Sequence, residues 1–227
     1  MTAFVLSLKL SLYTTVILVP LGYLIARWLA RSNGRLRALI EALLLLPLLL
    51  PPTVIGFYLL LAFSPASAFG DLLEKLSGLR LVFSFSGLVV ASLIVNLPFA
   101  VQPVLQSFRS IPPALFDAAE VGGMPFWRML KDIEIRLVWP GILSAAMLTF
   151  AHTMGEFGVV LMVGGNIEGL TRTASIAIYD HVQAFEYAAA TWMTLGLLAV
   201  SLVALVIVNV IGHRAQARHG RGLSIGS

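Results

Sequence analysis

Cysteine is absent from this sequence, and charged residues are scarce. Without cysteine the chain has neither disulfides nor thiolate metal ligands. Charged residues make up 11% of the 227 residues, whereas a soluble domain carries roughly 25%. Since 59% of the residues are hydrophobic and the mean hydropathy is +0.93, the polar surface cannot cover a globule in water. The composition excludes a soluble fold and indicates an integral membrane protein.

The apolar runs are nearly continuous rather than alternating, which predicts α-helices instead of a β-barrel. A helix needs about 20 apolar residues to cross a hydrocarbon core about 30 Å thick. Five segments meet this length, so we expect an all-α, polytopic membrane protein that forms a single domain over residues 1–227. The segments are residues 4–26, 40–63, 82–104, 137–163 and 190–211.

Prolines lie within these predicted spans, at Pro20, Pro47, Pro51, Pro52, Pro98 and Pro103. Each removes a helix hydrogen bond and predicts a kink in its segment. Kinked spans are common in transporters and channels, but they also arise from ordinary packing. The prolines therefore favour a transporter only slightly.

Most basic residues lie in three segments that alternate to the same side of the predicted membrane. Basic loops mark the cytoplasm, so we expect the N-terminus outside and the C-terminus inside. This placement also explains the sequence pI of about 9.8 without a nucleic-acid partner. Lys9 fits least well, and it either snorkels outward or precedes the first span. The eleven basic residues are Arg27, Arg31, Arg35, Arg37, Arg109, Arg128, Lys131, Arg136, Arg214, Arg218 and Arg221.

The cytoplasmic loop, at about 106–137, is the most informative stretch, and we call it the coupling loop. Pro112 and Pro113 suit the first turn of a helix. Residues 114–121 then predict two helical turns, and Gly122 with Gly123 predicts their C-terminal stop. Pro125 opens the next helix, which continues into the fourth span.

The short helix of this loop suits a docking partner. Asp117 and Glu120 supply negative charge near its start, where the helix dipole favours acids. Ala118 and Ala119 have little side-chain bulk, so a partner surface can approach closely. The alternative is a helix lying flat on lipid, but such a helix would be richer in Lys and Arg.

The coupling loop resembles the cytoplasmic EAA motif of ABC importer membrane subunits. The matching run is Asp117-Ala118-Ala119, three residues, Gly123, nine residues, then Ile133-Glu134-Ile135-Arg136. Asp replaces the family's Glu, and Arg136 stands where the family has Pro. The resemblance implies a type I ABC importer permease fold and a helix that docks onto a cytoplasmic ATPase. The implied coupling residues are Asp117, Ala118, Ala119, Glu120, Gly122, Gly123 and Pro125.

The chain has no nucleotide site of its own. A phosphate-binding loop needs a Gly-Lys-Ser/Thr run, and Lys9, Lys75 and Lys131 each lack a preceding Gly. We therefore expect a transport subunit rather than an enzyme, with no cofactor or metal of its own. ATP and Mg would be bound by the partner ATPase.

His152 and Glu156 lie four residues apart in the fourth predicted span and so share a helix face. Ionisable residues at membrane depth are costly and usually face a cavity or the bundle interior. One interpretation is a gate or a dimer-interface constraint beside the pathway. The other is a structural pair whose partners satisfy each other. Two ligands are too few for a metal.

A glycine-rich outer loop follows, over residues 164–169, and leads to Arg172. Glycine-rich turns expose backbone N–H groups, and Arg172 is the only cation of this loop. Both features suit brief contact with an oxyanion. A plain turn with a local salt bridge is the alternative for Arg172 taken alone.

Several runs resemble molybdate ABC transporter permeases. They are Gly155-Glu156-Phe157-Gly158, Gly165-Asn166-Ile167, Thr171-Arg172-Thr173, Ile178-Tyr179, and the segment 46–56. The resemblance implies a homodimer in the bacterial inner membrane, two copies of a cytoplasmic ABC ATPase, and an extracytoplasmic molybdate-binding protein, with tungstate as a second substrate. The implied pathway or gate residues are Gly155, Glu156, Phe157, Gly158, Asn166, Thr171, Arg172 and Thr173.

A rival interpretation is a gradient-driven small anion carrier or channel that acts without an ATPase. It would explain the kinked spans and Glu156. It leaves the coupling loop without a role.

Overall fold

The computed structural model describes residues 2–220. The side chains of Thr2, Ser77, Glu120, Val208 and Asn209, and those of residues 211–220, are outside this description. The described part of the chain is built from helices and connecting turns. The elements are α1 (Thr2–Arg31), α2 (Arg35–Leu49), α3 (Pro52–Phe63), α4 (Ala68–Ser77), α5 (Phe85–Arg109), α6 (Pro113–Val121), α7 (Phe126–Met129), the π-helical turn η1 (Leu130–Glu134), α8 (Ile135–Gly155), α9 (Gly158–Gly164), α10 (Ala174–Gln183) and α11 (Tyr187–Gly220).

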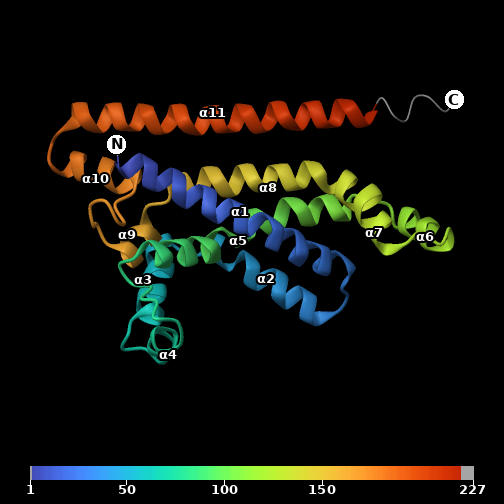
Figure 1. The fold of residues 1–227 in the computed structure, drawn as a ribbon, viewed down its shortest axis with the longest axis horizontal. Helices are drawn as coiled ribbons and strands as arrows, with labels where there is room; N and C mark the ends of the chain where they lie inside the picture. Colours follow the sequence, from blue (N-terminus) through green and yellow to red (C-terminus); the bar gives the residue numbers. More distant parts are fainter. Residues whose placement is uncertain (1, 221–227) are drawn as a thin grey trace.

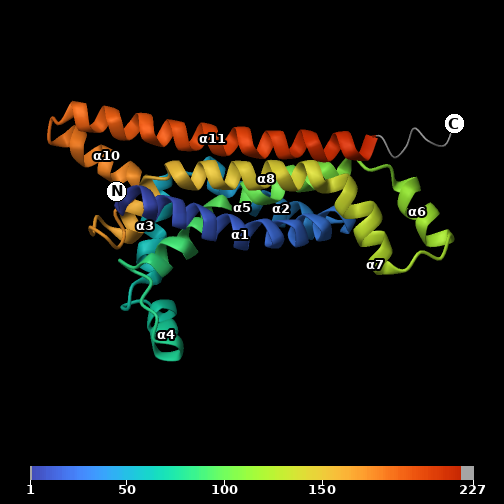
Figure 2. The same cartoon turned by 45° about the horizontal axis from the view of Figure 1, so that its top comes forward.

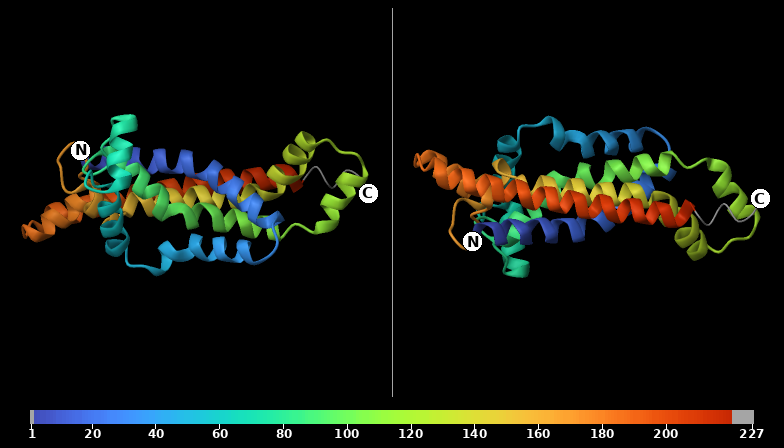
Figure 3. Two further views of the ribbon diagram at one scale, coloured as in Figure 1. Left: turned by 90° about the horizontal axis from the view of Figure 1, so that it is seen from below. Right: turned by 90° about the horizontal axis from the view of Figure 1, so that it is seen from above.

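Helices α1, α5 and α8 form the centre of an elongated bundle (Figure 1). Helix α2 packs on the outer side of α5, and α11 runs along α8 (Figure 3). Helices α6 and α7 lie at one end of the bundle, whereas α9, α10 and the N-terminus lie at the other (Figure 2). The coupling loop and the outer loop are thus at opposite ends, as expected if a membrane separates them.

Within the described residues, four helices are long and apolar enough to cross a membrane, and the bent pair α2–α3 makes a fifth if it forms one span. The four are Ala3–Arg31, Phe85–Arg109, Phe126–Gly155 and Tyr187–Ile207. These helices confirm the all-α membrane fold, with ends that differ from the predicted ones. Helix α5 begins at residue 85 rather than 82, because Ser84 caps it by accepting a hydrogen bond from the Gly87 N–H at 3.1 Å.

The second predicted span is not one straight helix. Helices α2 and α3 meet at an angle of 110°, and their 15 and 12 residues extend only about 22 and 18 Å. Two prolines cause the break: Leu50 precedes Pro51 and is extended, with ψ of 141°, and Pro52 has no N–H to donate. The other prolines in the predicted spans lie inside continuous helices, at Pro20, Pro47, Pro98 and Pro103.

The fourth predicted span ends at residue 155 rather than 163. Helix α8 stops at Gly155, and the chain resumes as the separate short helix α9 at Gly158. At its other end α8 continues without interruption from α7 and η1, as predicted for the helix that begins after Pro125. Glu156 therefore lies at a helix break and not within a membrane helix.

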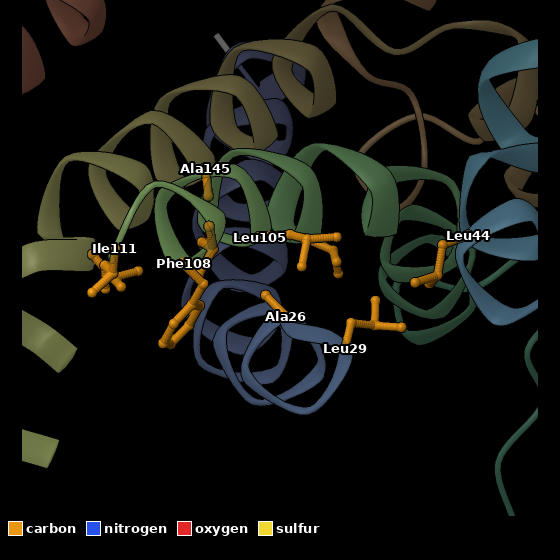
Figure 4. Close-up of a cluster of buried hydrophobic side chains, with 10 residues drawn as sticks. Ala26, Leu29, Leu44, Leu105, Phe108, Ile111 and Ala145 are labelled. Atoms are coloured by element: carbon orange, nitrogen blue, oxygen red, sulfur yellow. The ribbon is translucent and has the colours of Figure 1, made fainter. Parts of the chain in front are cut away.

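The largest core cluster lies where α1, α2, α5 and α8 meet near the coupling loop (Figure 4). Small residues allow these helices to approach closely, as is common between membrane helices. A Cβ added to Gly22 of α1 would lie 2.9 Å from the Ala100 carbonyl oxygen of α5, and one added to Gly141 would lie 2.6 Å from the Pro103 carbonyl oxygen. The cluster is formed by Ala26, Leu29, Leu44, Val101, Val104, Leu105, Phe108, Ile111, Val138 and Ala145.

Candidate functional site

The short helix of the coupling loop forms over the predicted residues, but its first turn holds no acidic residue, because Asp117 and Glu120 come after that turn. Helix α6 begins at Pro113, and Gly123 terminates it in the left-handed conformation with φ of +64°. The Gly122 N–H donates to the Ala118 carbonyl at 2.9 Å, and the Met124 N–H donates to the Ala119 carbonyl at 3.0 Å. The second bond is the long closing bond of a Schellman motif, which favours glycine at the left-handed position.

The exposed face of α6 determines what a partner can touch. Asp117 and Ala118 are exposed, and Val121 is 90% exposed. Ala119 is buried within the chain at 7% exposure, so only one of the two predicted alanines presents its methyl group. Beyond the helix, the candidate coupling residues Gly122, Gly123 and Pro125 are all exposed. The side chain of the remaining candidate, Glu120, is outside the described residues.

Where the coupling loop leads into α8, its Glu134 forms a buried ion cluster that sequence reasoning missed. Glu134, in the π-helical turn, is fully buried. Its carboxylate accepts hydrogen bonds from Arg27 Nε at 2.6 Å and Nη2 at 3.2 Å, from Arg31 Nη2, and from the Tyr23 hydroxyl at 3.3 Å. Tyr23, Arg27 and Arg31 are spaced by four residues and share one face of α1. We call these four residues the Glu134 cluster.

The same two arginines also contact the coupling loop through its aromatic residues. The Arg27 guanidinium lies over the Phe126 ring of α7 at 5.1 Å, and that of Arg31 lies over the Phe116 ring of α6 at 5.6 Å. Cation–π contacts of this kind add to the ion pairs. The end of α1 is thereby attached to α6, to α7 and to the turn from which α8 begins.

At the other end of the bundle, Glu156 holds the break between α8 and α9. It is 6% exposed, and its Oε1 accepts a hydrogen bond from the Val159 N–H at 3.3 Å, which caps the start of α9. Its Oε2 lies 3.5 Å from Nδ1 of His152, which also lies 2.9 Å from Asn96 Oδ1. Since Asn96 Nδ2 donates to the Ser92 carbonyl, that Oδ1 is an acceptor and His152 is the donor. This geometry favours the structural-pair interpretation, and a gating role stays a prediction.

The neighbours of Glu156 are placed by packing. A Cβ added to Gly158 would lie 2.9 Å from the Pro52 Cβ, so only glycine lets α9 approach the start of α3 this closely. The Phe157 ring packs on Tyr179 of α10 at 5.1 Å. Gly155 is exposed and has open space beside it.

Arg172 is held by local partners. Its Nε donates to Asn166 Oδ1 at 2.6 Å and lies 3.5 Å from Asp180 Oδ2, while its Nη1 lies 3.7 Å from Glu168. Asn166 in turn donates to both carboxylate oxygens of Asp180, at 2.9 and 2.7 Å. The arrangement matches the alternative of a turn with local salt bridges. Contact with an oxyanion stays a prediction.

Thr171 and Thr173 are buried beside this turn. The Thr171 hydroxyl accepts a hydrogen bond from the Ile167 N–H at 3.1 Å and so closes the loop. The Ala174 N–H at the start of α10 donates to Ser7 of α1 at 2.8 Å. The outer loop is thus attached to the first membrane helix. Among the described residues, none of the His, Asp and Glu side chains form a group that could hold a metal.

A family model described as a binding-protein-dependent transport system inner membrane component matches residues 19–221. The match includes all the candidate coupling and outer-loop residues. The chain belongs to this family. It is therefore a multi-pass, inner-membrane permease subunit, and the prediction of a transport component is confirmed.

Individual relatives agree with this assignment. The molybdenum transport system permease protein ModB of Azotobacter vinelandii is 46% identical over 200 residues, which is 88% of this chain and 88% of the relative. ModB of Escherichia coli K12 is 32% identical over 221 residues, 96% of each chain. A bacterial alginate ABC transporter, crystallised with its alginate pentasaccharide-bound periplasmic protein, has a chain of the same fold, with a TM-score of 0.75, 21% identity, and coverage of 94% of this chain and 78% of that one.

Replacing Glu134 with glutamine is expected to destabilise the protein by about 1–3 kcal/mol, because two guanidinium groups lose a buried counter-charge but remain partly hydrated. The measurement is the thermal unfolding of the purified protein in detergent. The matched control is Asp132→Asn in the same helical turn, where the carboxylate is exposed and 3.7 Å from Arg136. Equal stability of the two variants would contradict the assigned role of the Glu134 cluster.

Substitutions of Glu156 separate its two interpretations. A cap needs only an acceptor for the Val159 N–H. Glu156→Gln is therefore expected to leave the free energy of unfolding unchanged, whereas Glu156→Ala is expected to lower it by about 1 kcal/mol. Thermal unfolding of both variants, together with transport by the assembled complex, tests this expectation. If Glu156→Gln unfolds like the native protein but transports poorly, the charge itself acts in the pathway and the structural interpretation is insufficient.

Proposed function

We propose that the chain is the permease subunit of an ATP-driven importer of molybdate, with tungstate as a second substrate. Membership of the binding-protein-dependent family supports import coupled to other subunits. The two molybdenum transport relatives, which are 46% and 32% identical to this chain, support the substrate class. Molybdate and tungstate are oxyanions of nearly the same size and charge, so the proposal includes both.

The proposed assembly contains two copies of this chain, two ATPase subunits and an extracytoplasmic binding protein. Each copy of the chain forms a single permease domain. The periplasmic protein in the alginate transporter complex supports the binding protein. ATP and Mg belong to the ATPase, and the chain itself catalyses nothing. Only 6% of the apolar stretch of α11 is buried within this chain, against 56% for α5. This exposure supports an assembly in which a second copy or lipid covers α11.

The proposed orientation places the coupling loop in the cytoplasm and the N-terminus outside. Arg31 ends α1, Arg109 ends α5, and Arg35 begins α2, so basic residues gather at the end of the bundle that carries α6. Basic residues mark the cytoplasmic side.

The proposed coupling mechanism runs through the Glu134 cluster. ATP binding closes the ATPase pair and displaces α6, and Arg31 with Phe116 passes this displacement to α1. Glu134 passes it to the turn from which α8 begins. Membrane helices are thus biased between an outward-open and an inward-open state by ATP and its hydrolysis, as a two-state equilibrium requires. This attachment of α6 to α1 and α8 is the observation that carries the proposal.

The rival, a carrier driven by an ion gradient, is not favoured. It gives no role to an exposed helix that contacts α1 through Phe116 and Arg31, and the family acts with binding proteins. Molybdate uptake that persisted after ATP depletion, with the membrane potential maintained, would favour it.

Gly123→Arg is expected to abolish binding of the ATPase while leaving membrane insertion intact. Gly123 is exposed and has open space beside it, so the bulky cation would project from the end of α6 toward the partner. Gly123→Asn is the control, because asparagine tolerates the left-handed conformation and adds no charge. Co-purification of the ATPase measures the result, and an Arg variant that binds and transports normally would exclude α6 as the docking element.

The substrate is tested by molybdenum and sulfur uptake at low external oxyanion in cells that lack this gene. We expect molybdenum uptake to fall and to return with the intact gene, while sulfate uptake stays unchanged. Restoration by the native chain but not by Gly123→Arg would connect uptake to the ATPase. Loss of sulfate uptake in place of molybdenum uptake would overturn the substrate assignment.

A further inference from the structure

A cavity of about 470 Å³ lies between α1, α2, α5 and α6, beside the coupling loop. Its size is within the range of small-ligand sites, about 300–1,000 Å³. Its lining combines basic and apolar side chains. The basic side chains are Arg31, Arg37 and Arg109, and the apolar residues are Ala30, Phe108, Ile111, Pro113 and Phe116.

The cavity carries more positive than negative charge. Arg37 and Arg109 share the single carboxylate of Glu41, at 4.0 and 2.7 Å. Arg31 shares the carboxylate of Glu134 with Arg27. Four guanidinium groups therefore face two carboxylates, and each guanidinium has five N–H donors.

These arginines are also partly removed from water. The side chains of Arg31, Arg37 and Arg109 are 42%, 25% and 33% exposed. Partly desolvated cations with unused donors favour an anion that has several oxygen acceptors. A phosphate group or another tetrahedral oxyanion has this chemistry.

The position of the cavity favours a lipid as the source of that anion. Arg31 and Arg109 are the last residues of two membrane-spanning helices, so the cavity lies where hydrocarbon gives way to headgroups. Helix α2 begins beside it and exposes Leu36, Leu39 and Leu43 at i, i+3 and i+7. This stripe gives acyl chains an apolar surface on the same helix that supplies Arg37.

We propose that the cavity binds the phosphate of an anionic lipid headgroup from the cytoplasmic leaflet, with its acyl chains along the leucine stripe of α2. Basic pockets between membrane helices on the cytoplasmic side bind such headgroups in general. The leaflet rests on the orientation in the proposed function. Because Pro113 and Phe116 of α6 line the cavity, the bound lipid holds the coupling loop against α1, α2 and α5.

The test is native mass spectrometry of the complete transporter in detergent, titrated with phosphatidylglycerol. Arg37→Gln combined with Arg109→Gln is expected to weaken binding about fivefold for each arginine removed. The matched control removes the same charge at exposed positions outside the cavity, with Arg35→Gln and Arg128→Gln. If both double variants lost the same binding affinity, the arginines would act only through long-range electrostatic attraction of the lipid, and the proposal would be overturned.

Glu41→Gln provides a change of opposite sign. Its carboxylate competes with the lipid phosphate for Arg37 and Arg109, so its removal is expected to tighten phosphatidylglycerol binding about fivefold. If Glu41 instead acted only by holding α2 to α5, its loss would weaken binding. Weaker binding in this variant would therefore contradict the proposal.

Two further probes identify the source of the anion. Phosphatidylethanolamine, which has no net charge, is expected to bind weakly, and inorganic phosphate at the same concentration is expected not to displace phosphatidylglycerol. Displacement by inorganic phosphate would make the cavity a site for free oxyanions and overturn the lipid assignment. The measurement requires no transported substrate, so a failure of the molybdate assignment would leave its result intact.

Discussion

The carboxylate of Glu134 has no exposed surface, and its pairing with Arg27 and Arg31 joins α1 to the π-helical turn at the coupling end of the bundle. An unpaired charge at this depth costs several kcal/mol, so α1 and the π-helical turn must stay together. The same two cations lie over Phe126 and Phe116, which places α7 and α6 as well. One buried charge thus positions the two arginines that contact α6 and α7.

At the opposite end, two helix breaks stabilise each other. Helix α3 follows the break at Pro51, and α9 follows the break at Glu156. The two short helices pack closely through glycines: a Cβ on Gly56 would lie 2.8 Å from the Met162 Cβ, and one on Gly158 would lie 2.9 Å from the Pro52 Cβ. Irregular backbone at membrane depth is tolerated where protein covers it. Each break supplies that cover for the other.

The polar groups of the outer loop form hydrogen bonds and ion pairs with neighbouring residues of the same chain. Arg172 is surrounded by Asn166, Asp180 and Glu168, and the Thr171 hydroxyl closes the loop on the Ile167 N–H. A cation that already faces two carboxylates attracts an oxyanion weakly. In the proposed importer this suits a passage that releases its substrate and leaves selection to the binding protein.

Local chemistry was enough to predict α1, α5, α8, α11 and the short helix that stops at Gly123. In a membrane, run length and backbone hydrogen bonding decide where helices form, and glycine decides where this one ends. The 110° bend and the stop at Gly155 depend on how α3 packs on α9. The partner of Arg27 lies 107 residues away, and its neighbour Asp132 carries the same charge but is exposed. Only folding selects which carboxylate is buried, because burial arises from contacts between segments that are distant in the chain.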